Sequence, residues 1–268
     1  MECKSAIEKF EQYVEKRIIE ANNSGQFFRY VNRKLGRSHD TGVLKDSDGQ
    51  VIADDAGKAC LLNTYFNSIN VVDDAACPAF QLRTDGRLDD VSFDANAVRK
   101  HCNKMRPKSS SGPDGYPPFL LKQIGPSIAG IIAQLFQSFM SIGRVPSDWK
   151  QAIIKPLFTK GASSDPASYR PISLTSIFSK LMEKIIVEQM LKYLLTNNLI
   201  SKQQHGFLSR RSTATNLIES LNDWTVKMEN RQGQYVAYID FAKAFDSVSH
   251  PKLLTKLGAY GIGGVSLN

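Results

Sequence analysis

The sequence predicts an α+β fold in which helices predominate and short strands lie between them. Three observations support this prediction. Apolar residues recur at helical spacing in several segments, and the turn Asp46–Gly49 separates two short apolar runs. In addition, the hydrophobic run Tyr235–Ile239 reads as a strand that ends at the carboxylate of Asp240.

Composition limits the function classes that fit the chain. At 268 residues it can hold one large domain or two small ones, and its net charge of +8 favours a polyanionic partner such as nucleic acid, although a basic protein without such a partner is equally compatible. The charged N-terminus is not a secretory signal, and the apolar stretch 124–142 is too polar for a membrane span, so no membrane partner is expected. The cysteines lie far apart and predict free thiols in a reducing compartment: Cys3, Cys60, Cys77 and Cys102.

The first 92 residues are predicted to form a helical N-terminal segment followed by a linker. Helical periodicity covers residues 4–22, a second short helix covers 26–35, and a hairpin surrounds the turn 46–49. A further helix is marked by Ala59, Leu62, Phe66 and Ile69. Residues 71–92 show little periodicity, which indicates a linker.

The next segment predicts helices separated by loops and a strand. Asp94 can cap a helix that carries Val98, Cys102 and Met105 on one face, and the loop 109–115 follows it. A long apolar helix is expected over 117–142, a strand begins at Ala152, and a loop covers 161–169. Later helices are expected over about 20 residues from 177, over 214–228, and over 251–257, where Pro251 suits the first turn and Gly258 the end.

The run 238–248 carries the most informative chemistry. A carboxylate such as Asp240, at the end of a rigid strand, can hold a metal ion beside a nucleotide. Phe245 follows five residues later and could close a sugar pocket so that a 2′-hydroxyl is excluded, whereas Asp246 could orient the loop by accepting backbone hydrogen bonds. The alternatives are a turn-capping aspartate and a core phenylalanine.

Two other clusters carry cations. Lys160 and Arg170 flank a loop and could clamp a triphosphate, although a solvated loop with ordinary surface charges has the same composition. The basic helix after Asp94 contributes Lys104 and Lys108 to a surface for nucleic acid.

The third cluster precedes the helix over 214–228. Ser212 or Thr213 can cap that helix, and Arg210 and Arg211 near its N-terminus would attract phosphate. Phe207 could stack on a base or lie in the core, and His205 reads as a loop histidine with no metal-ligating neighbour in sequence.

Taken together and in order, these motifs resemble the reverse transcriptases of non-LTR retrotransposons, especially the jockey-like group. The resemblance runs from about Ser109 to Gly261 and is looser over residues 1–80. Its motifs are Ser-Gly-Pro-Asp-Gly at 111–115, Val-Pro-Ser-Asp-Trp-Lys at 145–150, Thr-Lys-Gly at 159–161, Tyr-Arg-Pro-Ile-Ser-Leu at 169–174, Gln-His-Gly-Phe at 204–207, Arg-Ser-Thr at 211–213 and Ile-Asp-Phe-Ala-Lys-Ala-Phe-Asp at 239–246. Any one of them is weak, but their fixed order is specific.

The resemblance implies a right-hand polymerase, with fingers over 93–232 and the beginning of a palm over 233–268. It implies that Asp240 is the first metal-binding aspartate, that Phe245 discriminates the sugar, and that Lys160 and Arg170 meet the incoming triphosphate. Two Mg²⁺ ions, an RNA template, a DNA primer and deoxynucleoside triphosphates are then the expected cofactor and partners. Action in the nucleus and cytoplasm follows from the same resemblance.

The family's Pro-Gln-Gly loop and its Ala-Asp-Asp hairpin, which supplies the other metal-binding aspartates, do not follow Asp246 in this sequence. We therefore expect the isolated chain to be an inactive fragment of a polymerase, with Tyr235–Ile239 exposed as an unpaired edge. Replacement of the hairpin by Asp54-Asp55 would require a permuted palm, so this pair is expected to start a turn or helix. The alternatives are a non-catalytic fingers module that binds nucleic acid, and a non-functional relic.

Overall fold

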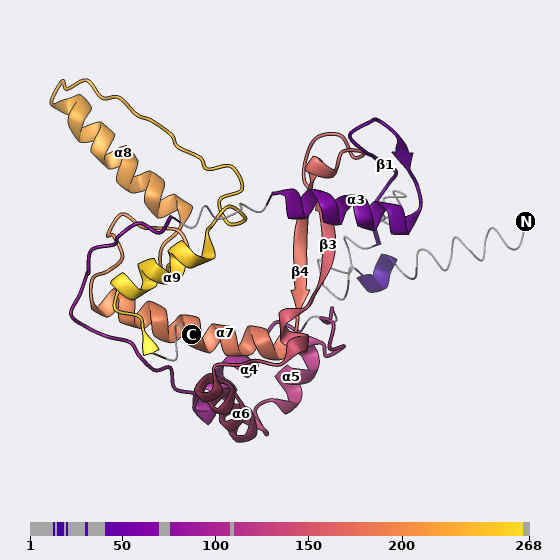
Figure 1. The fold of residues 1–268 in the computed structure, drawn as a ribbon. Helices are drawn as coiled ribbons and strands as arrows, with labels where there is room; N and C mark the ends of the chain where they lie inside the picture. The colour runs from indigo at the N-terminus through magenta and orange to yellow at the C-terminus, as the bar shows by residue number, and fades with distance from the viewer. Residues whose placement is uncertain are drawn as a thin grey trace, which may run out of the picture. The chain divides into compact units, whose positions relative to one another are not determined.

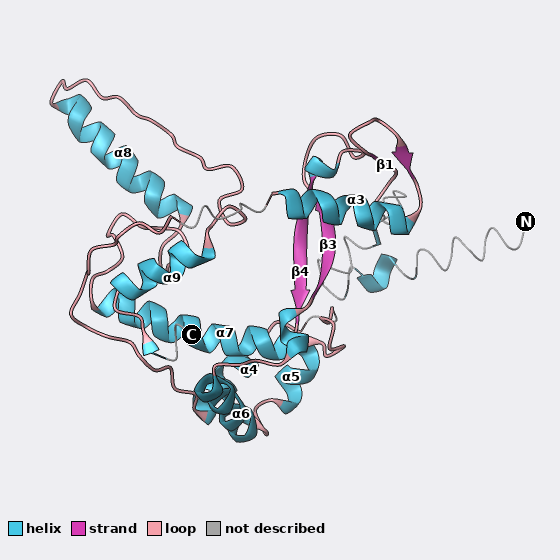
Figure 2. Cartoon of the chain, in the orientation of Figure 1, coloured by secondary structure: helices cyan, strands magenta, loops and turns pink. Residues whose placement is uncertain are grey.

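A computed structural model of the chain describes residues 13, 15–18, 20, 30–31, 41–69, 76–107 and 110–264. The chain divides into two compact units, residues 1–59 with 160–168 and residues 60–159 with 169–268. Helices predominate, and the described strands form two separate two-stranded sheets (Figures 1 and 2). This mixture is consistent with the predicted α+β class.

The core of the larger unit lies among α4 (Ala95–Asn103), α5 (Pro118–Ile124), α6 (Ala129–Ile142) and α7 (Ile177–Thr196). The helix α4 packs against each of the other three. The fully buried side chains at the centre of this core are Val98, Cys102, Phe136, Leu181 and Ile185. Edge-to-face contacts extend the core to the 3₁₀ helix η1 (Ser147–Lys150), with ring centroids of Phe136 and Trp149 5.9 Å apart.

The sequence prediction for α4 is confirmed in detail. The Asp94 carboxylate accepts hydrogen bonds from the backbone N–H groups of Asn96 at 2.7 Å and Ala97 at 2.8 Å. These bonds satisfy donors that the first helical turn would otherwise leave unpaired. The predicted face of Val98, Cys102 and Met105 is buried, because it meets α6 and α7.

The single long helix expected over 117–142 is wrong. The structure divides it into α5 and α6, which are bent by 117° relative to one another. The division falls at Gly125-Pro126, because proline has no N–H for the helical ladder and its ring clashes with the preceding turn. The end at Gly143 is confirmed, with a left-handed φ of 67°.

Within the described residues no single helix is long and apolar enough to cross a membrane. Only α5 and α6 together reach the necessary length and composition, as a bent pair.

The second sheet is an antiparallel ribbon of β3 (Ala152–Phe158) and β4 (Tyr169–Thr175). Its register places Phe158 opposite Tyr169, and these two rings touch edge to face at 5.6 Å. The predicted strand start at Ala152 is confirmed, and the expected loop ends in the short helix η2 (Pro166–Ser168), so the second strand begins at Tyr169.

The smaller unit contains the predicted hairpin, with β1 (Leu44–Lys45) paired to β2 (Val51–Ile52). The carboxylate of Asp46 closes its turn by accepting from Gln50 N at 2.8 Å. The backbone N–H of Lys45 donates to Ser164 O in the loop after β3 at 2.8 Å.

The pair Asp54-Asp55 begins α3 (Asp55–Ser68), as expected. Asp54 accepts from Gly57 N at 2.7 Å, and Asp55 forms an ion pair with Lys58 at 2.8 Å. Both carboxylates therefore serve the helix start. Of the helices expected over 4–22 and 26–35, the described residues 13, 15–18, 20 and 30–31 are helical, and the remainder lie outside the described residues.

The helix α8 (Thr213–Glu229) forms as predicted, with a capping box between Ser212 and Thr215. Most of its apolar stripe is nevertheless exposed, Trp224 is only partly covered, and none of its residues is buried. The helix α9 (His250–Ala259) carries Pro251 in its first turn as expected, but it continues through Gly258 and ends one residue later.

The predicted strand Tyr235–Ile239 is wrong: this segment has no regular structure. A strand needs a neighbour to satisfy its backbone groups, and no described residue pairs with it. Its expected exposure is confirmed.

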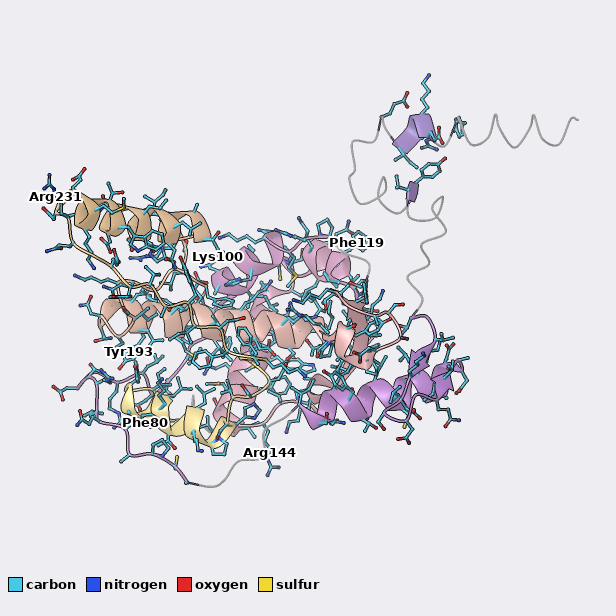
Figure 3. The ribbon with its side chains drawn as sticks, turned by 90° about the horizontal axis from the view of Figure 1, so that it is seen from above. Phe80, Lys100, Phe119, Arg144, Tyr193 and Arg231 are labelled. Atoms are coloured by element: carbon cyan, nitrogen blue, oxygen red, sulfur yellow. The ribbon has the colours of Figure 1, made fainter. Side chains whose placement is uncertain are left out.

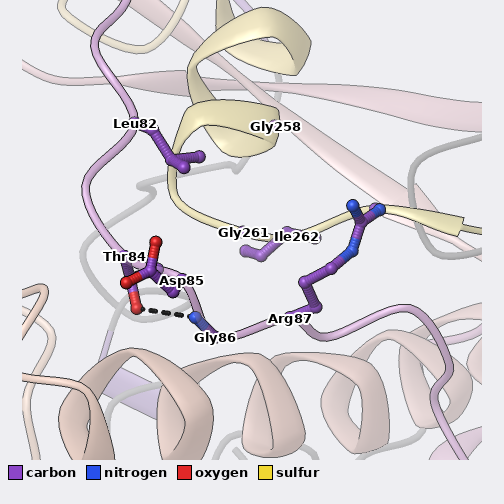
Figure 4. A pocket seen from close by; sticks show the side chains of 9 residues that line it. Leu82, Thr84, Asp85, Gly86, Arg87, Gly258, Gly261 and Ile262 are labelled. Carbon is purple, nitrogen blue, oxygen red and sulfur yellow. Dashed lines mark hydrogen bonds between the residues drawn. The ribbon is translucent and has the colours of Figure 1, made fainter.

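The turn after α9 holds the linker segment in place. Leu88 N donates to Gly261 O at 2.8 Å and Gly263 N donates to Leu88 O at 3.0 Å, which forms a parallel bridge. The hydroxyl of Tyr193 on α7 donates to Gly86 O at 2.7 Å. Tyr193 is labelled in Figure 3 and Gly86 in Figure 4. Gly261 has a φ of +78°, and a Cβ there would lie 2.2 Å from Gly86 O, so only glycine fits.

A small cavity lies between the linker segment and the turn after α9 (Figure 4). It is lined by Leu82, Thr84, Asp85, Gly86, Arg87, Gly258, Gly261, Ile262 and Gly263.

Candidate functional site

The β3–β4 ribbon brings two cations to one face. The register places Lys155 opposite Ile172 and Leu157 opposite Arg170. Directly opposed residues share a face, so Lys155 and Arg170 are diagonal neighbours, with about 7–8 Å between their backbones. Both side chains are exposed, and neither forms an ion pair with a described residue. They can therefore grip one phosphate or two adjacent phosphates.

Lys160, the other predicted triphosphate ligand, lies beyond the end of β3. It is exposed in the loop that belongs to the smaller unit. The sequence prediction assigned a phosphate-binding role to Lys160 and none to Lys155. Side chains alternate between the two faces of a strand. Counting back from the pairing of Phe158 with Tyr169 therefore places Lys155 on the same face as Arg170.

The Ser-Gly-Pro-Asp-Gly loop packs on the junction between β4 and α7. Gly112 is buried there, and a Cβ on it would lie 2.4 Å from Thr175 O. The next residue, Ser176, is fully buried and caps α7 by accepting from Phe178 N at 3.2 Å. Asp114 accepts from Tyr116 N through Oδ1 at 3.1 Å, while its buried Oδ2 has no partner among the described residues. The loop therefore fixes the base of the ribbon to the helical core.

His205 is not the simple loop histidine that the sequence predicts. Its side chain is only 4% exposed, and its Nε2 lies 2.9 Å from Glu219 Oε2 on α8. Its Nδ1 lies 2.9 Å from Thr215 Oγ1, which is also part of the capping box of α8. Both ring nitrogens of His205 are therefore engaged by side chains of α8. His205 thus anchors the Gln-His-Gly-Phe loop to the first two turns of α8.

The anchored loop presents Phe207 to solvent and to one aromatic neighbour. Phe207 is 86% exposed and has a left-handed φ of +63°. Its ring centroid lies 5.9 Å from that of Phe245, with an interplanar angle of 85°. Two residues that the sequence assigned to separate roles, in nucleic-acid stacking and in sugar selection, are therefore in contact.

The arginines of the same loop differ in availability. Arg210 is exposed and makes no hydrogen bond or ion pair with a described residue. Arg211 is partly buried, and its Nη1 donates to Lys202 O. Of the two, Arg210 is the one free to meet phosphate.

Asp240 lies in an exposed segment without regular structure. Within the described residues, no three His, Cys, Asp or Glu side chains lie close enough together to hold a metal ion. The carboxylate of Asp246 accepts no hydrogen bond from a described residue, so its loop-orienting role stays a prediction. The turn between these aspartates is held by Lys243, whose Nζ donates to Tyr65 Oη at 2.9 Å and lies 4.7 Å from that ring's centroid.

The basic helix is less available to nucleic acid than its charge suggests. Lys100 and His101 both bind Glu188 of α7, the latter at 2.8 Å. The hydrogen bonds from Lys100 and then from His101 lower the pKa of Glu188. Lys104 is exposed at the C-terminal cap of α4, and Lys108 lies outside the described residues.

The cysteines that are described are free thiols, as expected: Cys60, Cys77 and Cys102. Burial raises the pKa of the Cys102 thiol, which lies in the core.

Comparison with known families identifies the part of the chain that holds most of these features. Residues 158–266 match the reverse transcriptases (RNA-dependent DNA polymerases). The matched range includes Lys160, Arg170, the anchored loop and Asp240. It covers less than half of the chain.

Individual relatives agree with this family. The RNA-directed DNA polymerase from mobile element jockey of Drosophila melanogaster is 35% identical over 126 residues, which are 47% of this chain and 14% of that protein. The jockey polymerase of Drosophila funebris is 27% identical over 59% of this chain and 18% of its own length. The probable RNA-directed DNA polymerase from transposon BS of Drosophila melanogaster is 27% identical over 56% of this chain and 17% of its own length.

These matches support the resemblance to a reverse transcriptase of a jockey-like, non-LTR retrotransposon. The chain spans less than a fifth of the length of these relatives.

Proposed function

We propose that this chain is the N-terminal part of an RNA-directed DNA polymerase from a jockey-like mobile element, and that it does not polymerise by itself. The observation that carries the proposal is the family match over 158–266, which includes Arg170 on β4, the anchored loop and Asp240. In this proposal, residues 1–92 precede the polymerase, 93–232 form the fingers, and the palm begins at 233.

Each candidate residue has a role in the proposal. Arg170, with Lys160, contacts the triphosphate of the incoming deoxynucleotide, and Phe245 excludes a 2′-hydroxyl. Phe207, Arg210, Arg211, Lys104 and Lys108 contact the RNA template or the DNA primer. The resemblance alone suggests action in the nucleus and cytoplasm.

The inactivity of the isolated chain follows from its metal ligands. The family resemblance implies two Mg²⁺ ions, and two adjacent divalent cations need several carboxylates to offset their repulsion. Asp240 is exposed and belongs to no acidic cluster within the described residues, so the residues present do not fit two ions. The described part of the chain therefore supplies binding groups and one carboxylate, which do not by themselves assemble a two-metal centre.

The test is primer extension on an RNA template with Mg²⁺, with the chain of residues 1–268 beside a form extended by the rest of its polymerase sequence. Activity in the extended form only, abolished by Asp240→Ala, is the expected result. Template-dependent products from 1–268, lost in Asp240→Ala, would refute the proposed inactivity. Absence of products from the extended form would refute the polymerase.

A non-catalytic module that binds nucleic acid is the alternative function. The exposed cations Lys155, Arg170 and Arg210, none of which is paired with a described residue, favour it. Binding of single-stranded nucleic acid by both forms, without extension by either, would support this alternative. Absence of binding as well would indicate a relic.

A further inference from the structure

Phe207 and Phe245 make an unusual contact for two surface residues. They are 86% and 78% exposed, and their rings meet edge to face with centroids 5.9 Å apart. Aromatic pairs prefer this geometry, since the positive edge of one ring faces the negative face of the other. The family resemblance assigns a sugar-selecting role to Phe245 and none of this kind to its partner.

The backbone that carries Phe207 is held in a conformation that side-chain-bearing residues rarely adopt. Its φ of +63° lies in the left-handed region. Such conformations persist only where surrounding contacts determine them, and they concentrate at functional sites. The loop is held one and two residues earlier, where Gln204 Nε2 donates to Gly206 O at 2.9 Å and the ring of His205 lies 2.9 Å from both Thr215 and Glu219.

A continuous set of contacts therefore runs from a helix to the sugar-selecting ring. The helix α8 holds His205, His205 fixes the loop, and the loop places Phe207 against Phe245. Phe245 itself is in a turn whose other described anchor is the Lys243–Tyr65 hydrogen bond. Without Phe207, no other aromatic ring of the described chain touches Phe245.

We propose that Phe207 is a positioning residue for Phe245, and that it sharpens the selection of deoxyribonucleotides over ribonucleotides. The inference rests on the proposed polymerase function. A wall of apolar atoms rejects an added hydroxyl by at most about 10²-fold, and only if it is held close to the sugar carbon. A Phe245 ring free to rotate would leave room for the 2′-hydroxyl.

The experiment measures kcat/KM for a deoxynucleotide and for its ribonucleotide in the extended, polymerising form. Phe207→Ala should lower the ratio of the two between about twofold and about tenfold, the range that an edge-to-face pair contributes. The loss should come from a lower KM for the ribonucleotide relative to the KM for the deoxynucleotide. Phe207→Tyr keeps the ring and should retain the ratio.

Two further variants separate positioning from general damage. His205→Ala frees the loop and should lower the ratio in the same direction as Phe207→Ala. Phe119→Ala removes an exposed ring of α5 that lies outside the site, and it should leave the ratio unchanged (Figure 3). An unchanged ratio in an active Phe207→Ala enzyme would overturn the proposal, and so would an equal loss in Phe119→Ala. Weaker template binding with an unchanged ratio would show stacking on nucleic acid instead.

The contact itself can be measured in residues 1–268, whether or not the protein polymerises. With phenylalanine labelled for NMR, Phe245→Leu should shift the ring protons of Phe207, because the ring current of its neighbour is lost. Unmoved Phe207 signals would refute the contact. An extended wild-type form without any polymerase activity would instead refute the proposed function, so the two failures are distinguishable.

Discussion

Replacing Gly112 by alanine should destabilise the larger unit. A Cβ at this position would lie 2.4 Å from Thr175 O, 2.5 Å from Thr175 C and 2.9 Å from Ser176 N. All three are backbone atoms, and ordinary contacts of a Cβ begin near 3.4 Å. Ser176 is the buried cap of α7, whose Leu181 and Ile185 belong to the core. The overlap of about 1 Å must therefore be relieved by moving the loop or the helix start, and such overpacking costs about 1–3 kcal/mol.

Urea unfolding followed by circular dichroism measures this free energy in wild type and variant. Gly130→Ala in α6 is the matched control, since apart from its chain neighbours and its own helix backbone no heavy atom lies within 4 Å of the added Cβ, and its backbone is helical. That change should stabilise by up to about 1 kcal/mol, because glycine loses more backbone entropy in a helix than alanine. Equal stabilities of Gly112→Ala and wild type, or shifts of the same sign in both variants, would refute the packing argument.

Three further predictions concern protonation, reactivity and binding. The pKa of Glu188 is lowered in the folded state, so its contribution to stability is complete above the unfolded carboxyl pKa and is lost as pH falls through the lower folded value. Glu188→Gln should reduce the decrease in the free energy of unfolding at acidic pH, and an unchanged decrease would contradict this. Burial of Cys102 raises its pKa, so iodoacetamide should modify it more slowly than exposed Cys60 under native conditions, as read by mass spectrometry; equal rates would contradict its burial. Fluorescence anisotropy can measure how the binding constant for single-stranded RNA falls with salt concentration, and Lys155→Ala should reduce the slope of this log–log plot by about 0.7. Arg87→Ala is the control: its guanidinium is paired with Asp89 at 3.1 Å, so the slope should not change. Equal slopes for wild type and Lys155→Ala would show that this lysine contacts no phosphate.

The elements that the sequence predicts well are those whose signals are local. The cap at Asp94, the cap at Ser212 and the stripe of α7 each depend on residues within a few positions of one another. Capping and helical periodicity are short-range properties, so they can be read without knowing the rest of the fold. The break at Gly125-Pro126 is also local, but the apolar periodicity of both flanks outweighs one proline and predicts a continuous helix.

The strand expected over 235–239 failed for a different reason. Its composition is that of a strand, but a strand exists only beside another strand that accepts and donates its backbone hydrogen bonds. No described residue does so, and the segment is exposed. Composition therefore predicted what this segment could form, and long-range pairing decided what it forms in this chain.

The same distinction between local signals and long-range contacts applies to the candidate site. The order of its motifs predicted the family, and the match over 158–266 agrees with that prediction, while the roles of the individual residues stay predictions. The contacts of His205 with Glu219, and of Phe207 with Phe245, join residues 14 and 38 positions apart. A spacing of that kind carries no periodic signal, so neither contact could be predicted from one sequence.

The contrast between α7 and α8 bears on the metal-binding role proposed for Asp240. Both helices carry apolar stripes, yet α7 buries Leu181 and Ile185 of its stripe and packs against α4, while α8 has no buried residue. Periodicity thus predicts a helix and its apolar face, but not what covers that face. The segment around Asp240 is likewise apolar and uncovered, with Tyr238, Ile239 and Phe241 exposed. A metal-binding carboxylate must be held within about half an ångström of its working position, and an uncovered segment cannot do this. The position of Asp240 should therefore depend on contacts that the described residues do not make, which is why primer extension must compare this chain with its extended form.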